Sequence, residues 1–469
     1  MQSGGISGSK TPPRRLCSAR LVSEMKKAKQ SLRGKSDEQL MRLPHMTEFK
    51  SLMAMRILSI VSLDCMVTRP KLFPFLALKM VNLTMEYGLC EHSSLAFALY
   101  GILCMKVKEK MNEGYQYGNL ALKLLDMYKM DEYLPRVHAA VYGKQFHVIH
   151  SFRIISFVCL NMLFGRTVQI GIIAAWKKPV KDTLEPLMRA HQVGKLTGDM
   201  EFASLCANLY CFNKFWAGPS LDIVEKDFKR FNSWMRSQKQ ETGLRMSEPC
   251  LHLLQVLTGK IEDPTNTAYL DAQMEHAAKT NNSMACAGVA EQKIMIGYLF
   301  NDCGLGRDEV FQEFEDCPTP DFSLVLRKTF QALYFLRLAR SGHKKRQCLR
   351  QARKILRWMQ EMSEKSPHNF ADKALLVEAE LLSVLGKSDK AYEKYTVAIA
   401  MAAASEFTCI HAIALERVAW HVFRQPNADV AQAESYFNQA SEKYEQWGAH
   451  GKVEDLKNEV ASIFGHMKF

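Results

Sequence analysis

Hydrophobic residues recur every three to four positions along most of the chain, which is the period of an α-helix. The clearest case is the stretch "ADKALLVEAELLSVLGKSDKAYEKYTVAIAMA" at 371–402. The pattern predicts one helix from about Asp372 to Leu385 and a second helix beyond Gly386, which interrupts it. One stripe of the second helix carries Ala391, Tyr395, Ala398 and Ile399. The stretch therefore predicts a helical hairpin.

The residues of this hairpin match a known repeat pattern. Gly386, Ala391, Tyr395 and Ala398 occupy the small, small, aromatic and small positions of a tetratricopeptide repeat. Small residues let two helices approach, and the aromatic ring fills the space toward the next hairpin. A second copy repeats the offsets at a longer period, with Ala433, Phe437 and Ala440. We expect these seven residues to pack the repeats together.

The fold predicted from this pattern is all-α, a degenerate tetratricopeptide-like superhelix of helical hairpins, or α-solenoid. We divide it into N-terminal helical repeats at 36–143, middle repeats at 175–318 and C-terminal tetratricopeptide-like repeats at 319–469. Ser36 is the expected N-cap of the first helix, because acidic residues follow it directly in "SDEQL".

The first 35 residues differ in composition from the rest. They hold nine Lys and Arg residues against one acid, Glu24, and they are rich in Ser and Gly. We expect a disordered basic tail over 1–35. A transit peptide and a nucleic-acid-binding arm are the alternatives that this charge pattern leaves open.

Residues 144–174 form an apolar insert of uncertain origin. No acidic residue occurs between Glu132 and Asp182, and the insert contains "IISFVCLNMLFG". A membrane span would bring Arg166 near the bilayer centre, at a cost of about 2.5–3.5 kcal/mol. We prefer translated non-coding sequence, such as a retained intron. A lineage-specific insertion and a true span remain the alternatives.

Residues that could carry catalysis, a cofactor or a metal are not evident. "GGISGSKT" departs from a phosphate-binding loop because Ser9 separates Gly8 from Lys10. His147 and His150 lack a nearby third ligand. We therefore expect no catalytic residue, no cofactor and no metal site. The 13 cysteines show no C-x-x-C pair, which favours a reducing compartment and a cytoplasmic location.

Basic residues gather in "HKKRQCLRQARK", residues 343–354. The run could contact phosphate, but no aromatic residue is interleaved with it. A solvated helix face is the interpretation that we prefer. The whole chain carries a formal charge of +13. A basic helical repeat that binds nucleic acid is therefore retained as an alternative function.

Several strings resemble a known family. "GKSDEQLMRLPHMT", "LFPFLALKMVNLTMEYGL", "DTLEPLMRAHQVGKLTGDMEFASLCANLYC" and "YEQWGAHGKVEDL" occur in order, and the resemblance covers about 29–456. It is to the helical region of hybrid signal-transduction histidine kinases and related kinase–ATPase sensor proteins. In that family a kinase-like domain and an ATPase domain precede the helical region, and sensor and output domains follow it. None of the matching strings carries a catalytic residue of the family.

The resemblance implies a role in protein interaction and signal transduction. We expect a non-catalytic scaffold that binds a peptide or a neighbouring signalling domain through its concave face, coupling an ATPase or kinase module to a sensor or output module. The first alternative is a fragment of a larger histidine kinase or ATPase whose catalytic domains lie outside this chain. We expect no small-molecule substrate, and neither nucleic acid nor a membrane as the main partner.

Overall fold

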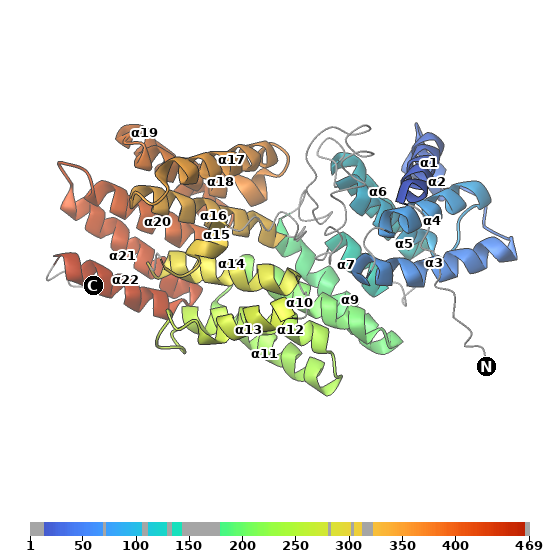
Figure 1. The fold of residues 1–469 in the computed structure, drawn as a ribbon, viewed down its shortest axis with the longest axis horizontal. Coiled ribbons are helices and arrows are strands. Elements are labelled where there is room, and N and C mark those ends of the chain that lie inside the picture. Colours follow the sequence, from blue (N-terminus) through green and yellow to red (C-terminus); the bar gives the residue numbers. More distant parts are fainter. Residues whose placement is uncertain are drawn as a thin grey trace, which may run out of the picture. The chain divides into compact units, whose positions relative to one another are not determined.

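The computed structural model describes residues 14–68, 72–105, 111–128, 134–142, 179–279, 283–301, 304–311 and 322–464. Within these ranges the elements are α-helices (Figure 1), apart from the short 3₁₀-helix η3 (Val180–Thr183) and an isolated bridge between His45 and Leu89. The prediction of an all-α fold is confirmed. The insert at 144–174, with His147 and His150, lies outside the described residues.

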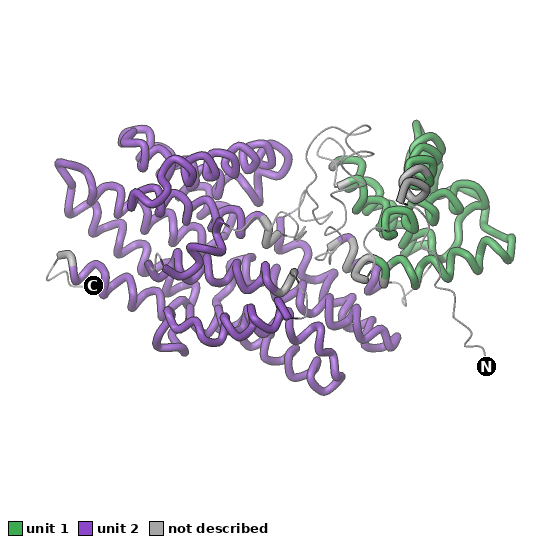
Figure 2. The backbone as a smooth tube through the Cα atoms, viewed as in Figure 1, with its two compact units in different colours: residues 1–130, 146–169 green, residues 131–145, 170–469 purple. Residues whose placement is uncertain are grey.

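The chain divides into two compact units (Figure 2). Unit 1 comprises residues 1–130 and 146–169, and unit 2 comprises 131–145 and 170–469. Our sequence-based boundaries differ from this division in two respects. The predicted N-terminal repeats, 36–143, are divided between the two units after residue 130. The predicted middle and C-terminal repeats, 175–318 and 319–469, belong to the same unit rather than to separate ones.

Unit 1 contains six of the described helices. They are α1 (Arg14–Leu32), α2 (Asp37–Met41), α3 (Phe49–Thr68), α4 (Phe73–Tyr87), α5 (Ser93–Met105) and α6 (Met111–Tyr128). Helix α5 packs against both α4 and α6, and Leu95 to Leu99 are wholly buried. The predicted N-cap is confirmed, because the Ser36 hydroxyl accepts a hydrogen bond from Gln39 N at 3.3 Å.

The expectation of a disordered tail is wrong for residues 14–32. Helix α1 spans these residues and packs against α4. Its contact face carries Leu21, Ala28 and Leu32, which are buried at intervals of seven and four residues. The sequence did not reveal this apolar face, because the many basic residues of the segment occupy the other positions of the helix and dominate its composition.

A close backbone contact ends α4. Gly88 has a φ of +102°, and a Cβ placed on it would lie 2.0 Å from Pro44 O. The adjacent Leu89 donates through its N–H to Pro44 O at 2.7 Å and accepts from Met46 N at 2.8 Å. Gly88 therefore lets the chain after α4 pair with the chain before α3.

Unit 2 begins with α7 (Leu134–Tyr142) and η3. Its remaining helices are α9 (Leu184–Thr197), α10 (Met200–Trp216), α11 (Leu221–Ser237), α12 (Glu241–Leu257), α13 (Ala268–Lys279), α14 (Ser283–Leu299), α15 (Arg307–Phe311), α16 (Phe322–Arg340), α17 (Lys345–Ser363), α18 (Pro367–Val384), α19 (Ser388–Ala404), α20 (Thr408–Phe423), α21 (Val430–Trp447) and α22 (His450–Phe464).

Successive helices of unit 2 pack as neighbours, and the closest pairs include α9 with α10, α16 with α17, α18 with α19, and α20 with α21. The hairpin predicted at 371–402 corresponds to α18 and α19, which meet at Gly386. Every residue of α20 is buried or half-buried. This helix is thus covered on all sides, and it forms the centre of the C-terminal part of the unit.

Helices from the two ends of unit 2 also meet. The rings of Phe215 in α10 and Trp447 in α21 lie 5.8 Å apart, and the Thr408 hydroxyl donates to Gly218 O at 3.1 Å. Helices α12 and α22 are in contact, and a Cβ on Gly451 would lie 2.6 Å from Val256 O. The unit therefore closes on itself through contacts between distant parts of the sequence.

Candidate functional site

The residues predicted to pack the repeats lie in the interior of unit 2. Ala391, Tyr395 and Ala398 of α19 and their counterparts in α21 are all wholly buried. The counterparts are Ala433, Phe437 and Ala440. The rings of Phe437 and of Trp420 in α20 form a T-shaped pair, with ring centroids 4.9 Å apart. The α19 and α21 sets stand at equivalent places in two neighbouring hairpins, each facing the preceding helix.

Gly386 ends the helix as expected, but it does not have the packing role that we also assigned to it. Its φ is +73°, and no atom lies within 4 Å of a Cβ placed on it. Gly386 N donates to Ser383 O at 3.1 Å, and Lys387 N donates to Leu382 O at 3.0 Å. Glycine is favoured here by the left-handed backbone that ends α18, and not by a close approach of helices.

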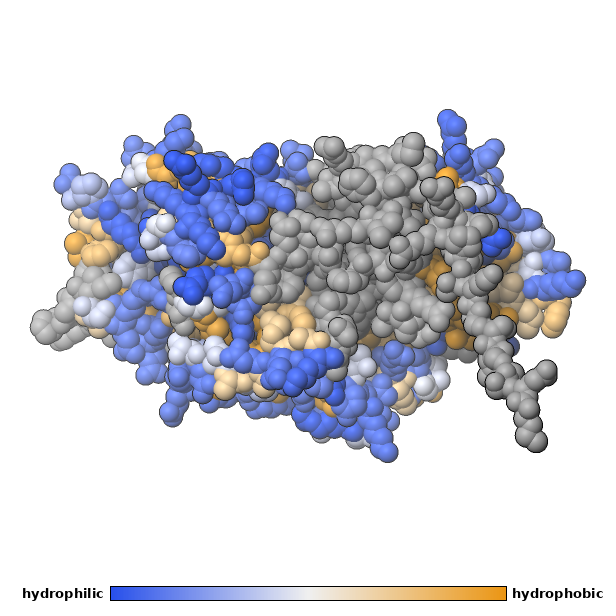
Figure 3. Space-filling model, viewed as in Figure 1, coloured by the Kyte–Doolittle hydropathy of each residue, from blue (hydrophilic) through white to orange (hydrophobic). Residues whose placement is uncertain are grey.

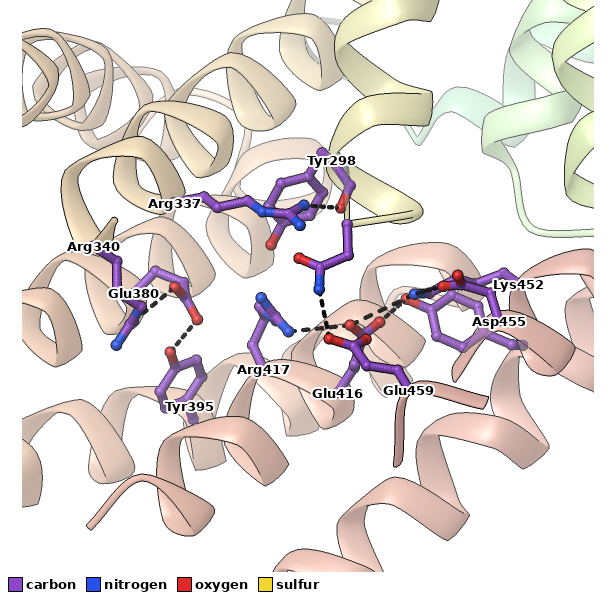
Figure 4. A network of polar contacts seen from close by, with 12 residues as sticks. Tyr298, Arg337, Arg340, Glu380, Tyr395, Glu416, Arg417, Lys452, Asp455 and Glu459 are labelled. Carbon is purple, nitrogen blue, oxygen red and sulfur yellow. Dashed lines mark hydrogen bonds and ion pairs between the residues drawn. The ribbon is translucent and has the colours of Figure 1, made fainter. Parts of the chain in front are cut away.

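Sequence analysis missed the most unusual feature of the interior, which is a network of charged side chains (Figure 4). It lies where α16, α18, α20 and α22 meet the end of α14. Glu416 of α20 is only 7% exposed. Its carboxylate accepts from Arg417 Nη2 at 3.1 Å and from the Tyr444 hydroxyl at 2.7 Å. Lys452 of α22 lies 3.8 Å from the same carboxylate and pairs with Asp455 at 2.8 Å.

The second half of the network centres on Glu380 of α18. Arg340 of α16 lies 3.2 Å from Glu380 Oε2 and also donates to the Ser383 hydroxyl at 3.1 Å. The Tyr395 hydroxyl of α19 donates to the other carboxylate oxygen. The aromatic residue at the repeat position thus does more than fill space. It connects α19 to a buried charge on α18, the other helix of the same hairpin.

The cationic neighbours keep both buried glutamates ionised. Burial opposes ionisation of Glu380, but Arg340, Arg417 and the Tyr395 hydroxyl outweigh it and hold the pKa of Glu380 below its ordinary value. Burial likewise opposes ionisation of Glu416, whereas Lys452, Arg417 and the Tyr444 hydroxyl hold its pKa low. Each carboxylate is therefore a buried anion that neighbouring helices neutralise.

Two donors at the edge of this network lack a partner. Arg337 donates through Nη1 to Tyr298 O at 2.7 Å and to Gly297 O at 3.1 Å, so it caps the end of α14. Its Nη2 and the Tyr298 hydroxyl are buried without a hydrogen bond. Figure 4 shows the Tyr298 hydroxyl directed toward Arg417. The network thus joins helices from α14 to α22, and two buried donors beside it make no hydrogen bond.

The charged groups of this network are paired with one another. The glutamates are ionised and engaged with cations, so neither is positioned as a proton donor, and the tyrosines around them have pKa values raised by burial. Across the described residues, no group of three or more His, Cys, Asp or Glu side chains could hold a metal ion. The ion pairs instead fix the relative positions of successive hairpins.

A second charged feature lies on the outer side of unit 2. The basic run predicted at 343–354 corresponds to the start of α17, whose other face buries Cys348, Ala352, Ile355 and Met359. The arginines of α17 at 346, 350, 353 and 357 are exposed, and Figure 3 shows hydrophilic side chains over this region. The structure therefore agrees with the preferred interpretation of a solvated helix face.

Several histidines and several cysteines of the described ranges lie in the interior. His191 is buried between the rings of Phe231 and Trp234, and its Nδ1 lies 2.9 Å from Ala203 O. The cysteines whose surroundings are described form no disulfide. Among the described helices, none has the length and apolar character needed to cross a bilayer.

Comparison of the chain with protein-family models and with curated proteins found no match.

Proposed function

We propose that the chain is a non-catalytic helical scaffold of degenerate tetratricopeptide-like repeats that binds a protein partner. It would couple an ATPase or kinase module to a sensor or output module in cytoplasmic signal transduction. The observation that carries the proposal is the network of Glu380 and Glu416. In this network the buried glutamates form ion pairs with Arg340, Arg417 and Lys452, most of them between helices. Such pairing supports a rigid arrangement of the helices rather than catalytic turnover.

The interior of the C-terminal hairpins is not the surface that we propose for the partner. We expected binding in a concave face, but α20 has no exposed residue. Residues of α14, α16 and α22 surround its charged positions. A partner is therefore better accommodated on the outer helices of unit 2, whose polar faces are exposed.

The resemblance to signalling proteins motivates a second form of the proposal. In that form the chain acts as the middle segment of a larger kinase or ATPase, and the same scaffold role is exercised in cis. Sequencing the transcript across the codons for 142–178 and its flanks tests this form. Kinase or ATPase coding sequence in frame would support it, and in-frame stop codons on both sides would contradict it.

The scaffold proposal is tested by a pair of measurements on the full chain. With ATP and Mg²⁺, we expect neither ADP release nor phosphotransfer above a buffer control. Light scattering should then detect a complex of defined stoichiometry with a co-expressed kinase or ATPase module. Turnover that a substitution such as Glu416→Gln abolishes, in a protein that still folds, would contradict the proposal. Failure to form any such complex would also count against it.

A further inference from the structure

Four arginines form a row along the exposed face of α17. They are Arg346, Arg350, Arg353 and Arg357, which we call the arginine stripe, and all four are exposed. Their offsets of four, seven and eleven residues place them on one side of the helix. The opposite side is anchored in the core of unit 2 through Cys348, Ala352 and Met359. The stripe is thus presented on a rigid support.

The arginine stripe lacks acidic partners within the part of the chain that the structure describes. No ion pair joins any of the four guanidinium groups to a carboxylate there. The sequence has no Asp or Glu from His343 to Gln360. Within the stripe, Arg357 Nε donates a hydrogen bond to the backbone carbonyl of Arg353 at 3.4 Å. The guanidinium charge is therefore available to a partner.

The electrostatics of α17 work against the helix itself. Like charges three and four positions apart repel each other, as in Arg346 with Arg350 and Arg353 with Arg357. Basic residues also occupy the first turn, where the helix dipole favours acids. Lys344, at the N-cap, has a φ of +41° and makes no side-chain capping bond. Residues that lower the stability of their own helix in this way are typical of a functional surface, such as a binding site.

We propose that the arginine stripe binds an acidic segment of a protein partner whose carboxylates recur at helical spacing. This inference rests on the proposed scaffold function and names the chemistry of the partner. The guanidinium groups rise about 6, 4.5 and 6 Å along the helix axis from one to the next. Carboxylates at offsets of four, seven and eleven on a second helix match these intervals. Guanidinium forks also bind carboxylates with two parallel hydrogen bonds.

The same surface fits nucleic acid and membranes less well. Single-stranded nucleic acid is usually bound with aromatic platforms, but the one aromatic residue of α17, Trp358, packs edge-on against Phe370 at 5.7 Å. A helix that binds at a membrane surface carries apolar side chains to insert. None of the exposed large hydrophobic residues of the described chain lies on α17.

The experiment compares defined probes on the full-length chain. The test peptide is an Ala-rich helix with Glu at offsets of four, seven and eleven, and its control has the same composition with the Glu residues dispersed around the helix. Single-stranded RNA, duplex DNA, and phosphatidylserine vesicles are measured in parallel at about 0.15 M salt, because charge-driven binding depends strongly on ionic strength.

Two matched variants separate the stripe from net charge. One carries Arg346→Glu, Arg350→Glu and Arg353→Glu. The other carries Lys226→Glu, Lys390→Glu and Lys457→Glu, three exposed lysines elsewhere in unit 2. Both change the total charge equally. If the first variant fails to fold, the triple Arg→Gln variant at the same positions replaces it.

We expect the patterned peptide to bind the wild-type chain more tightly than the dispersed peptide does. Its Kd should rise by about tenfold or more in the stripe variant and stay near the wild-type value in the lysine variant. Equal losses in both variants, no preference for the patterned peptide, or tighter binding of RNA, DNA or vesicles would overturn the inference. These outcomes leave the scaffold proposal standing, because that proposal is tested by the absence of ATP turnover and by complex formation with a kinase or ATPase module.

Discussion

The Tyr444 hydroxyl of α21 donates a hydrogen bond to the Glu416 carboxylate of α20 over 2.7 Å, and both side chains are buried. The same carboxylate faces Lys452 of α22. One buried anion thus connects three consecutive helices, including both members of the last hairpin and the helix that follows it.

Glu416→Gln should reduce the free energy of unfolding of unit 2 by about 3–5 kcal/mol, because it leaves Arg417 and Lys452 near one another without their anion. Tyr444→Phe should cost about 1–2 kcal/mol, because it removes a single hydrogen bond to a charged group. Urea unfolding followed by circular dichroism measures both. Equal effects of the two substitutions would show that the charge itself contributes little.

Acid should destabilise unit 2 through the same residues. The folded pKa values of Glu380 and Glu416 lie below their ordinary value of 4.5. Their contribution to stability is therefore complete above about pH 4.5 and is lost as the pH falls through the lower folded values. Glu459 acts in the opposite direction, because burial and the nearby Glu416 raise its pKa.

The midpoint of urea unfolding, measured from pH 7 to pH 3, should fall more steeply in the wild type than in Glu416→Gln. The variant has no titrating carboxylate at position 416 but keeps the other acidic residues. It therefore serves as the control for the effect of those residues on the pH dependence of stability. Parallel curves for the two proteins would contradict the origin that we give to the acid sensitivity.

Ala398→Arg tests the packing of the predicted repeat. Ala398 is wholly buried in α19, so the substitution combines overpacking with an unpaired buried charge and should cost several kcal/mol, about 3 or more. The neighbouring Val397 is 43% exposed, and Val397→Arg should change the stability by less than about 0.5 kcal/mol. Thermal unfolding compares them. A melting temperature unchanged by Ala398→Arg would refute the packing role.

Two glycine substitutions should act in opposite directions. Gly451→Ala places a Cβ 2.6 Å from Val256 O and 2.9 Å from Gly259 N, so it should separate α22 from α12 and lower stability. Gly288→Ala in α14 meets no atom within 4 Å and should stabilise the helix by about 0.5–1 kcal/mol. Differential scanning calorimetry measures both. A stabilising Gly451→Ala would mean that the contact between α12 and α22 is loose.

The helices of unit 2 could be predicted because their signals are local. The stripe of Ala391, Tyr395 and Ala398 and the stop at Gly386 are legible within one hairpin, and α18 and α19 occur where we expected them. Helix α1 was missed because its apolar face contains only a few residues, among them Leu21 and Leu32, within a strongly basic segment.

The charged network could not be predicted because its contacts are not local. Glu380 and Glu416 occupy helix positions that look like ordinary surface positions, and the cations beside them come from α16 and α22 as well as from α20. A weak signal existed, since Glu380 and the Glu416–Arg417 pair lie within largely apolar runs, "LLVEAELLSV" and "AIALERVAW", although the first also contains Glu378. A charge in such a run suggests a buried partner without identifying it.

The contact between Phe215 and Trp447 has a consequence for the synthesis of the protein. At ordinary translation rates, the roughly 230 residues between these rings take about 10–50 s to make. During that interval, the face of α10 that later meets α21 is without its partner. Nascent chains should therefore expose this aromatic surface until the C-terminal hairpins leave the ribosome, and chaperones that bind apolar segments should associate with them during that period.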